Sequence, residues 1–524
     1  MNSSTPSGEA AFPAVCEKHA GLFLTLAFLI PFVWLGVIRP PCMGSGEISS
    51  DAYYHVAMAE LGPSVFCAKT FPWLELSVWR DTFADKELLY HFALWGVVRT
   101  QEFLGLSTAA PFHFPAMVFM GITLLAFLFT MKRLGVSPPL ILAMSILMPL
   151  VIPNFTFRFL MLRPHVLSLA FLLLLIAMLS KGSVRFRTLW MLAISFFYTW
   201  SYSNPQFILI PAAVFALVGF REDSWKSLWI FAAALAGVLL GLLIHPQFPN
   251  SFLIWKVQSW DALFGPLLSD GAGNSVSLMP PKEMMAPMLS WHKIAIPFYV
   301  FAYFTFLCLA RLIEFRKLSA LPSYMIAVAV LSLLFTGGIL VVQRTIEYAA
   351  PFTVLLAGLV FDRALKEKIF LPWRDRPMKF CLALTLAAMA MACFSSVMNI
   401  SISRGTTPPA KEIGEWMGKN LPGNALLVNL NWGDFPAIFH ANRRQVYLWG
   451  MDPAFSVAAD PKRTRDLERL LLAPEHLTPR KLALLTGARY AFVLAKREDY
   501  VRYLKERGWR PVYETEHGCV FIME

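Results

Sequence analysis

The amino-acid sequence predicts a polytopic all-α membrane domain of about eleven transmembrane helices, followed by a small α/β domain. Of the 524 residues, 57% are hydrophobic and only 15% are Asp, Glu, Lys or Arg, whereas a soluble domain carries roughly 25% charged residues. Long apolar runs recur throughout residues 1–398. Residues 399–524 instead alternate helix and strand signals, which is typical of an α/β domain.

The net charge of +12 would also suit a nucleic-acid-binding protein. The basic residues, however, fall in short loops between apolar runs, which is the pattern left by membrane topology. We therefore expect membrane lipids, and no nucleic acid, as partners of this chain.

A transmembrane helix needs about 20 mainly apolar residues. The candidate runs are 21–38, 113–131, 138–153, 165–180, 188–200, 206–220, 227–244, 295–312, 322–341, 346–362 and 380–398. The first run is long and shows no small-x-small cleavage site, so we interpret it as a helix and not as a cleaved signal.

The Lys and Arg residues predict the orientation. One set of short loops holds sixteen of them, while the opposite short loops, 154–165, 201–205 and 342–348, hold only Arg158, Arg163 and Arg344. Because basic loops stay in the cytoplasm, we expect a cytoplasmic N-terminus and an external domain at 399–524. Two long loops, 39–112 and 245–293, are then also external.

The first long loop is too rich in Trp, Phe and Leu to be disordered. Its segment 86–98 (KELLYHFALWGVV) has apolar residues at helical spacing and predicts a helix near the membrane surface. Cys42 and Cys67 share this loop; a disulfide and two free thiols both fit the sequence. In the second long loop, 270–274 (DGAGN) is interpreted as a turn, either in a segment that orders on substrate or in a plain connector.

Seven elements are predicted in the C-terminal domain. Helices are expected at EIGEWMGKN, RTRDLERLLLA and DYVRYLKERG, and strands at ALLVNL, QVYLWG, RYAFVLA and VFIM.

Ionisable residues near lipid are costly, so those at the external helix ends are candidate site residues. In the segment Asp51-Ala-Tyr-Tyr-His55, the carboxylate suits a general base or a metal ligand. Tyr54 and His55 would line a sugar or phosphate site. The alternative is a solvated helix N-terminus that Asp51 caps.

A second group contains Asp81, Asp85, Lys86, Glu87 and His91. Glu87 and His91 are four residues apart and share one face of the predicted helix. Surface charge is the alternative, and it is favoured for Lys86.

Two further groups are basic. Arg163 and His165 flank Pro164 at a helix start, where headgroup anchoring and catalysis explain them equally well. Arg344 lies between the ninth and tenth predicted helices, and its planar guanidinium suits a phosphate. The alternative for Arg344 is an internal ion pair with Glu347.

Several signatures are absent from the sequence: a Walker A loop, a GxSxG elbow, an HExxH motif and a CxxC pair. ATP-driven transport and zinc proteolysis therefore lack support.

The order of these parts resembles the GT-C class of membrane glycosyltransferases. The segment 51–55 (DAYYH) is similar to the corresponding stretch of the oligosaccharyltransferase catalytic subunit. Residues 431–435 (NWGDF) and 440–443 (HANR) resemble that family's Trp-Trp-Asp-Tyr-Gly region. The segment 275–281 (SVSLMPP) resembles its flexible-loop motif, without the glutamate.

The resemblance implies a hexosyl- or oligosaccharyl-transferase with a polyprenyl-(di)phosphate sugar donor at the external membrane face. The acceptor is an unknown glycan, lipid or protein, and the membrane is a bacterial inner membrane, so that residues 399–524 are periplasmic. The residues implied as catalytic are Asp51, His55, Asp81 and Glu87. Those implied in binding the lipid phosphate are Arg344, Arg163 and His165, and those implied in substrate binding are Tyr54, Trp432 and Asp434.

The sequence departs from this family at residues that bind the metal ion. The oligosaccharyltransferases carry a second acidic motif in the loop between the third and fourth helices, and here that loop (154–165, NFTFRFLMLRPH) holds no acid. We therefore predict weak or no dependence on divalent cations. The alternative is Mg²⁺ or Mn²⁺ at Asp51, with the missing ligand from Asp81, Asp85 or Glu87.

Two other classes of function stay open. One is a lipid or polysaccharide transporter or flippase, although such proteins tend to show repeated halves and none is visible here. The other is a non-catalytic membrane scaffold that uses only its C-terminal domain.

The predicted orientation is testable with a reporter that is active only in the cytoplasm, fused after Glu524. The fusion should be silent, because the loop charges place residues 399–524 outside. A fully active fusion would show that one helix has been miscounted.

Overall fold

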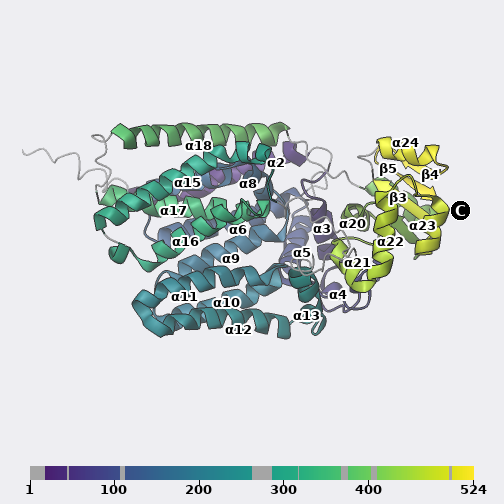
Figure 1. The fold of residues 1–524 in the computed structure, drawn as a ribbon, viewed down its shortest axis with the longest axis horizontal. Coiled ribbons are helices and arrows are strands. Elements are labelled where there is room, and N and C mark those ends of the chain that lie inside the picture. The colour runs from purple at the N-terminus through teal and green to yellow at the C-terminus, as the bar shows by residue number, and fades with distance from the viewer. Residues whose placement is uncertain are drawn as a thin grey trace, which may run out of the picture.

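The computed structural model describes residues 18–43, 46–106, 112–261, 286–316, 318–367, 376–402, 410–494 and 498–523. A bundle of long helices forms one end of the molecule and a five-stranded sheet with its own helices forms the other (Figure 1). Helices from the first long loop, residues 39–112, lie between these two parts.

Helices cover all eleven predicted apolar runs. They are α2 (Ala20–Met43), α6 (His113–Arg133), α7 (Pro138–Leu147), α8 (Pro153–Phe159), α9 (Pro164–Leu179), α10 (Val184–Ser201), α11 (Leu209–Asp223), α12 (Leu228–Leu243), α15 (Leu289–Arg316), α16 (Ser323–Gly338), α17 (Ile346–Lys366) and α18 (Arg376–Ile402).

Fewer of these helices are long and apolar enough to cross a membrane. Within the described residues six helical stretches qualify, or seven if α7 and α8, which meet at a bend of 89°, form one span. Helices α9 and α16 have only 16 residues each. The structure thus supports an integral membrane protein, while the count of eleven spans is not confirmed.

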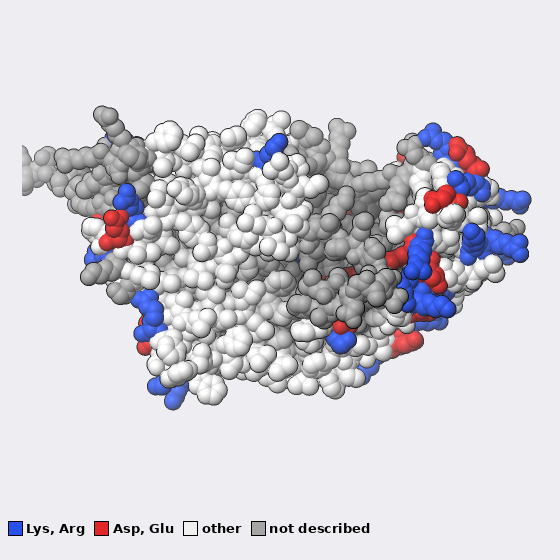
Figure 2. All heavy atoms as spheres, in the orientation of Figure 1, with Lys and Arg blue, Asp and Glu red and all other residues white. Residues whose placement is uncertain are grey.

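Charge is distributed as a membrane requires. Figure 2 shows the charged side chains gathered at the two ends of the long axis, with an almost uncharged face between them. Large apolar side chains such as Val37, Leu217 and Tyr303 are two-thirds exposed on this bundle, and lipid is the environment that suits them.

The loops predicted to be cytoplasmic meet one another at one end of the bundle. Arg133 donates to the carbonyl oxygen of Ala177 at 2.6 Å, and Arg187 forms an ion pair with Asp223. These contacts gather the basic loops on one side, as predicted. Which side of the membrane they face stays a prediction.

The first long loop folds into α3 (Ser50–Leu61), α4 (Pro63–Phe66), the 3₁₀ turn η1 (Val78–Arg80) and α5 (Leu88–Phe103). The predicted helix at 86–98 is thus present, shifted two residues toward the C-terminus at its start and longer at its end. Gly62 separates α3 from α4 with a φ of 65°, a conformation that glycine adopts without strain. Short helix α13 (Asn250–Trp255) follows α12.

The C-terminal part contains α19 (Lys411–Asn420), β1 (Leu426–Asn429), α20 (Phe435–Ala441), β2 (Val446–Tyr447), α21 (Pro453–Ala459), α22 (Pro461–Leu472), α23 (Pro479–Thr486), β3 (Tyr490–Leu494), α24 (Glu498–Glu506), β4 (Arg510–Thr515) and β5 (Gly518–Ile522). The strand order is β2-β1-β3-β5-β4. Strands β2, β1 and β3 are parallel, and β5 runs antiparallel to both β3 and β4.

All seven elements predicted for this part are present. The sequence patterns miss β4, whose residues are mostly exposed and therefore lack a buried apolar face. They also miss the short helices α20, α21 and α23.

The first long loop is joined to the sheet by backbone hydrogen bonds. Tyr447 of β2 donates its backbone N–H to Trp73 at 2.8 Å and accepts from Glu75 at 2.9 Å. Trp79 is fully buried beside this junction. Its ring lies 5.5 Å from that of Phe71 and 4.7 Å from that of Phe455, centroid to centroid. The loop and the C-terminal part therefore share one apolar core.

Cys42 and Cys67 are both free thiols, with Cys42 buried and Cys67 exposed. The segments 270–274 and 275–281, interpreted above as a turn and a flexible-loop motif, lie outside the described residues.

We expect Trp79→Ala to destabilise the protein by about 3–5 kcal/mol, because it leaves a cavity between the loop and the sheet. The apparent melting temperature of the detergent-solubilised chain measures this effect. Trp225→Ala is the matched control, since Trp225 is 72% exposed. Equal melting temperatures for the two variants would contradict the shared core.

Candidate functional site

Asp51 and Arg163 form an ion pair at the end of the bundle that faces the sheet. Asp51 lies in the first turn of α3, and Arg163 precedes Pro164 at the start of α9. The pair is partly accessible, with side-chain exposures of 29% for Asp51 and 16% for Arg163. An accessible carboxylate held beside a guanidinium meets the needs of both a base and an anion site.

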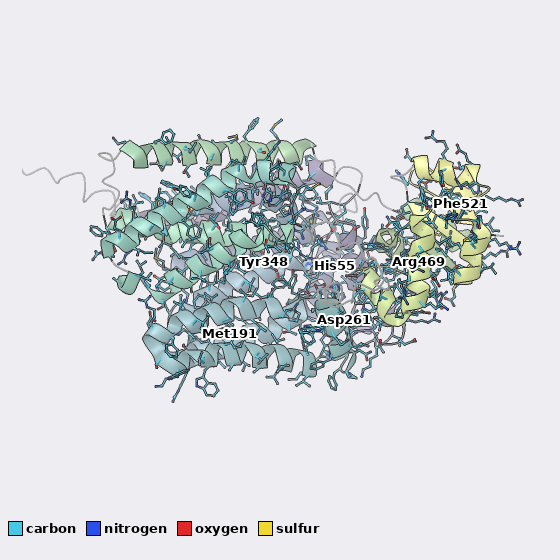
Figure 3. The ribbon with its side chains drawn as sticks, in the orientation of Figure 1. His55, Met191, Asp261, Tyr348, Arg469 and Phe521 are labelled. Atoms are coloured by element: carbon cyan, nitrogen blue, oxygen red, sulfur yellow. The ribbon has the colours of Figure 1, made fainter. Side chains whose placement is uncertain are left out.

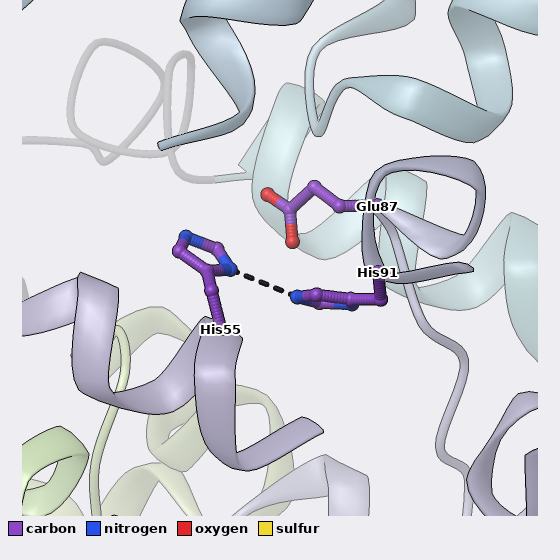
Figure 4. A group of neighbouring side chains, drawn as sticks. All are labelled: His55, Glu87 and His91. Atoms are coloured by element: carbon purple, nitrogen blue, oxygen red, sulfur yellow. Dashed lines mark hydrogen bonds between the residues drawn. The ribbon is translucent and has the colours of Figure 1, made fainter. Parts of the chain in front are cut away.

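One helical turn after Asp51, His55 enters a buried hydrogen-bonded chain. Its Nδ1 lies 2.8 Å from Nε2 of His91, and Nδ1 of His91 lies 2.7 and 2.9 Å from the two carboxylate oxygens of Asp85. Figure 3 places His55 at the end of the bundle that faces the sheet, and Figure 4 shows the contact between the two imidazoles. The order Asp85, His91, His55 is that of a proton-relay or ligand-orienting chain.

Glu87 completes this group. Figure 4 shows its carboxylate beside both imidazoles, and the ligand atoms of His55, Glu87 and His91 all lie within 4.8 Å of one another. In the described part of the chain, three buried oxygens here lack a hydrogen-bond partner: Glu87 Oε2, Tyr54 Oη and Tyr90 Oη. Each such atom costs about 1–3 kcal/mol, so this group is poised for a further partner.

The pKa values in this group follow from burial and from charge. Burial, then the neighbouring His91 and Arg163, holds the pKa of His55 well below its usual range. Burial raises the pKa of Glu87. Burial would also raise the pKa of Asp85, but the charge and the hydrogen bond of His91 outweigh it and lower that pKa.

A second ionic cluster lies at the same end of the bundle. Glu347 pairs with Arg158 and also with Arg344, whose Nε is 3.4 Å from Glu347 Oε1. Arg344 also donates to the hydroxyl of Tyr202 at 3.3 Å, and Tyr348 donates to the same hydroxyl at 3.2 Å. The internal Arg344–Glu347 pair, which the sequence left as an alternative, is therefore present.

A cavity of about 20 Å³, room for roughly one water molecule, lies between the two groups. Its lining includes Asp85, Lys86, Tyr202 and His245. Lys86 is mostly buried and lies 5.6 Å from the ring centroid of Phe455. The cavity is thus lined by residues of both groups, Asp85 from the first and Tyr202 from the second.

Two residues of this region were missed at the sequence level. Lys86 was interpreted as surface charge, but its side chain is only 13% exposed. Asp452 caps α21 from the C-terminal part and receives the backbone N–H of Ala454 at 2.9 Å. Burial, with a smaller contribution from Asp51, raises the pKa of Asp452. The one sequence signal that could have identified Lys86 as buried was its charge within a Trp- and Phe-rich loop.

Four other residues predicted for the site are Asp81, Asp434, Trp432 and His165. Asp81 is exposed and follows η1. Asp434 accepts the backbone N–H of Leu494 at 3.0 Å, and the neighbouring Trp432 packs against the core of the sheet. His165 donates its Nε2 proton to the carbonyl oxygen of Arg158 at 3.0 Å. These contacts give Asp434 and Trp432 a structural setting, while their predicted substrate roles stay predictions.

Asp51 is paired with a cation in the described part of the chain, and the predicted weak or absent dependence on Mg²⁺ or Mn²⁺ stays a prediction. Such ions need several oxygen ligands, and within the described residues the side-chain partner of Asp51 is the Arg163 guanidinium. We therefore assign no reaction step to a metal at Asp51.

No protein-family model and no curated protein sequence matches the chain. Solved structures do match it. The archaeal oligosaccharyltransferase AglB from Archaeoglobus fulgidus, in complex with an inhibitory peptide and a dolichol-phosphate, gives a TM-score of 0.60 at 11% identity, covering 92% of this chain and 71% of AglB.

Two further solved structures are similar. ArnT from Cupriavidus metallidurans, bound to undecaprenyl phosphate, gives a TM-score of 0.54 at 13% identity, covering 95% of this chain and 98% of ArnT. The arabinofuranosyltransferase AftD from Mycobacteria gives 0.53 at 13% identity, covering 100% of this chain and 40% of AftD. The predicted resemblance is thus confirmed at the level of structure: the chain has the fold of the GT-C membrane glycosyltransferases, similar to that of an oligosaccharyltransferase.

Proposed function

We propose that this chain is a GT-C glycosyltransferase that moves a sugar or glycan from a polyprenyl-(di)phosphate donor to an acceptor at the external membrane face. The observation that carries the proposal is the Asp51–Arg163 pair, which stands beside the Arg158–Glu347–Arg344 cluster at one end of an apolar bundle. Solved structures of the same fold hold dolichol-phosphate and undecaprenyl phosphate.

The charges favour an anionic ligand. Three arginines (Arg158, Arg163 and Arg344) face two carboxylates, Asp51 and Glu347, which leaves an excess of one positive charge. A guanidinium binds phosphate oxygens through two parallel hydrogen bonds. The ends of α9 and α17 would receive the phosphate while the polyprenyl chain lies along the lipid-facing bundle.

The proposed reaction is a displacement with inversion at the anomeric carbon. The acceptor oxygen or nitrogen attacks that carbon, the bond from carbon to the phosphate oxygen breaks, and the phosphate leaves with the electron pair. Asp51 takes the proton of the acceptor. Arg344 stabilises the charge that develops on the leaving phosphate, with Arg163 and His165 as further candidates for phosphate contact.

The Asp51–Arg163 pair also gives the donor a role in activating the base. A phosphate that binds Arg163 competes with Asp51 for the guanidinium. The Asp51 carboxylate would then turn to the acceptor only when the donor is in place. Such coupling would protect the donor from transfer to water.

Asp51→Asn should lower turnover by about 10²–10⁴-fold, the usual contribution of a general base. It should leave binding of undecaprenyl phosphate unchanged or tighter, because Arg163 loses its competing carboxylate. Arg163→Ala should weaken the same binding by about tenfold or more, the value of a hydrogen bond to a charged group.

Binding of undecaprenyl phosphate to the detergent-solubilised chain and release of polyprenyl phosphate from a polyprenyl-phosphate sugar measure the two effects. Glu102→Gln is the matched control, since Glu102 belongs to the same long loop and pairs with Arg99 on an exposed face of α5. Full turnover in Asp51→Asn, with normal expression, would remove Asp51 from the mechanism.

Arg344→Lys keeps the charge but loses the two-pronged geometry, so it should reduce turnover. Arg344→Ala should reduce turnover further, by about 10²-fold or more, if the guanidinium stabilises developing charge. Expression and melting temperature, measured beside activity, separate this effect from a loss of folding.

Arg311→Ala is the control for Arg344, because Arg311 pairs with Glu314 at the same spacing of three residues on an exposed helix face. If Arg344→Ala is expressed normally and turns over at the native rate, Arg344 is a structural or headgroup-anchoring residue.

A further inference from the structure

We propose that His55, Glu87 and His91 bind one divalent transition metal ion of the zinc type, which clamps α3 to α5. The three residues come from two elements of the first external loop: His55 from α3, and Glu87 and His91 from the start of α5. The inference does not depend on the proposed transferase activity, because it concerns only the side chains of these three residues and of Asp85.

The positions of the donor atoms suit an ion. All three ligand atoms lie within 4.8 Å of one another, and His55 Nδ1 is 2.8 Å from His91 Nε2. Nitrogen ligands of a tetrahedral zinc ion lie about 2.0–2.1 Å from the metal, which separates them by ~3.4 Å. Small side-chain rotations would therefore open the contact between the two imidazoles and admit the ion.

Asp85 orients His91 as an outer partner of a metal site does. Both of its carboxylate oxygens contact His91 Nδ1, at 2.7 and 2.9 Å, so Nδ1 carries the hydrogen and Nε2 presents its lone pair to His55 and Glu87. Carboxylates of this kind hold a ligating histidine in the correct tautomer and orientation. Asp85 is itself fixed, since it accepts the backbone N–H of Glu87 at 3.0 Å and donates its own to Gln247 at 2.6 Å.

The donor set selects the class of ion. Two imidazoles and one carboxylate are the ligands of zinc sites that keep an open fourth position, whereas Mg²⁺ and Ca²⁺ prefer oxygen ligands. Glu87 Oε2 is buried without a hydrogen-bond partner among the described residues. Lys86 Nζ lies 3.8 Å from the other oxygen, Glu87 Oε1, and an ion would give Oε2 a partner of its own.

The clamp would act on the proposed base without touching substrate. His55 follows Asp51 by one turn of α3, and His91 anchors the facing helix α5. A metal bridge across this contact would fix the first turn of α3 and hence the position of Asp51. His55 and His91 are in this sense positioning residues.

The test is zinc binding by the full-length chain, purified in detergent and first stripped with a chelator. Isothermal titration should give one equivalent of Zn²⁺ per chain, with no comparable binding of Mg²⁺. Co²⁺ should give the visible absorption of a site with nitrogen ligands. His55→Ala and His91→Ala should abolish the single equivalent, and Asp85→Asn should weaken it by about 10–100-fold.

His245→Gln is the matched control, because His245 meets Asp85 at its backbone carbonyl, at 3.2 Å, and accepts the backbone N–H of Gln247 at 3.2 Å, two hydrogen bonds that a glutamine amide can also form. It should keep the full equivalent of zinc. If the histidine variants do not fold, the Co²⁺ spectrum of the unaltered chain still tests whether the chain has a metal site with nitrogen ligands. A stripped chain that binds neither Zn²⁺ nor Co²⁺, or binding that survives in His91→Ala, would overturn the proposal, and neither result would bear on transferase activity.

Discussion

Arginines at the end of an apolar bundle must be paired, and this constraint organises the site. A charge taken out of water loses several kcal/mol of hydration unless a partner compensates it. Arg39 is fully buried and lies 2.6 Å from Glu47, while Arg158 and Arg344 share Glu347. Asp51–Arg163 is the most accessible of these ion pairs. A ligand that replaces one partner of this pair therefore pays the smallest cost in free energy.

Ion pairs also connect the two ends of the fold through helix α3. Glu60, at the end of α3, pairs with His440 of α20 and with Arg443, which follows α20. Asp51, at the start of α3, pairs with Arg163 of the bundle. Helix α3 is therefore held by ion pairs at both ends, toward the sheet and toward the membrane. Its central turn carries Tyr54 and His55 into the aromatic core beside Trp79. A shift of α3 would disturb all of these contacts together.

A rigid first loop explains why the site tolerates so many titratable groups in a small space. Two backbone hydrogen bonds, one donated by Tyr447 to Trp73 and one donated by Glu75 to Tyr447, fix the loop against the sheet. Asn250 donates to the carbonyl oxygens of Lys69 and Phe83, at 3.1 and 3.0 Å. Positions that are fixed in this way cost no reorganisation when charge develops during a reaction. A transporter, in contrast, needs the elements around its site to move.

The sequence by itself determined the class of the protein. Apolar runs, the grouping of Lys and Arg in alternate loops and the alternation of helix and strand after residue 410 are local patterns, and local patterns are legible in a single chain. The apolar runs all proved helical. Asp51 and Arg163 were both predicted as candidate site residues because charge is rare at the end of a membrane helix, and the structure pairs them. The number of spans was not settled in this way, because several runs are shorter than a bilayer requires.

Only the tertiary structure decided which of these residues meet. Spacing suggested the Arg344–Glu347 pair, three residues apart, but Arg158 reaches the same carboxylate from 189 residues away. Asp51 and Arg163 are separated by 112 residues, and His55 and His91 by 36. Asp452, whose pKa burial and the charge of Asp51 raise, belongs to the C-terminal part of the chain and not to the bundle. Such contacts arise from the packing of whole helices and a sheet, which no local period encodes, so the sequence supplied the candidate residues and the fold selected their partners.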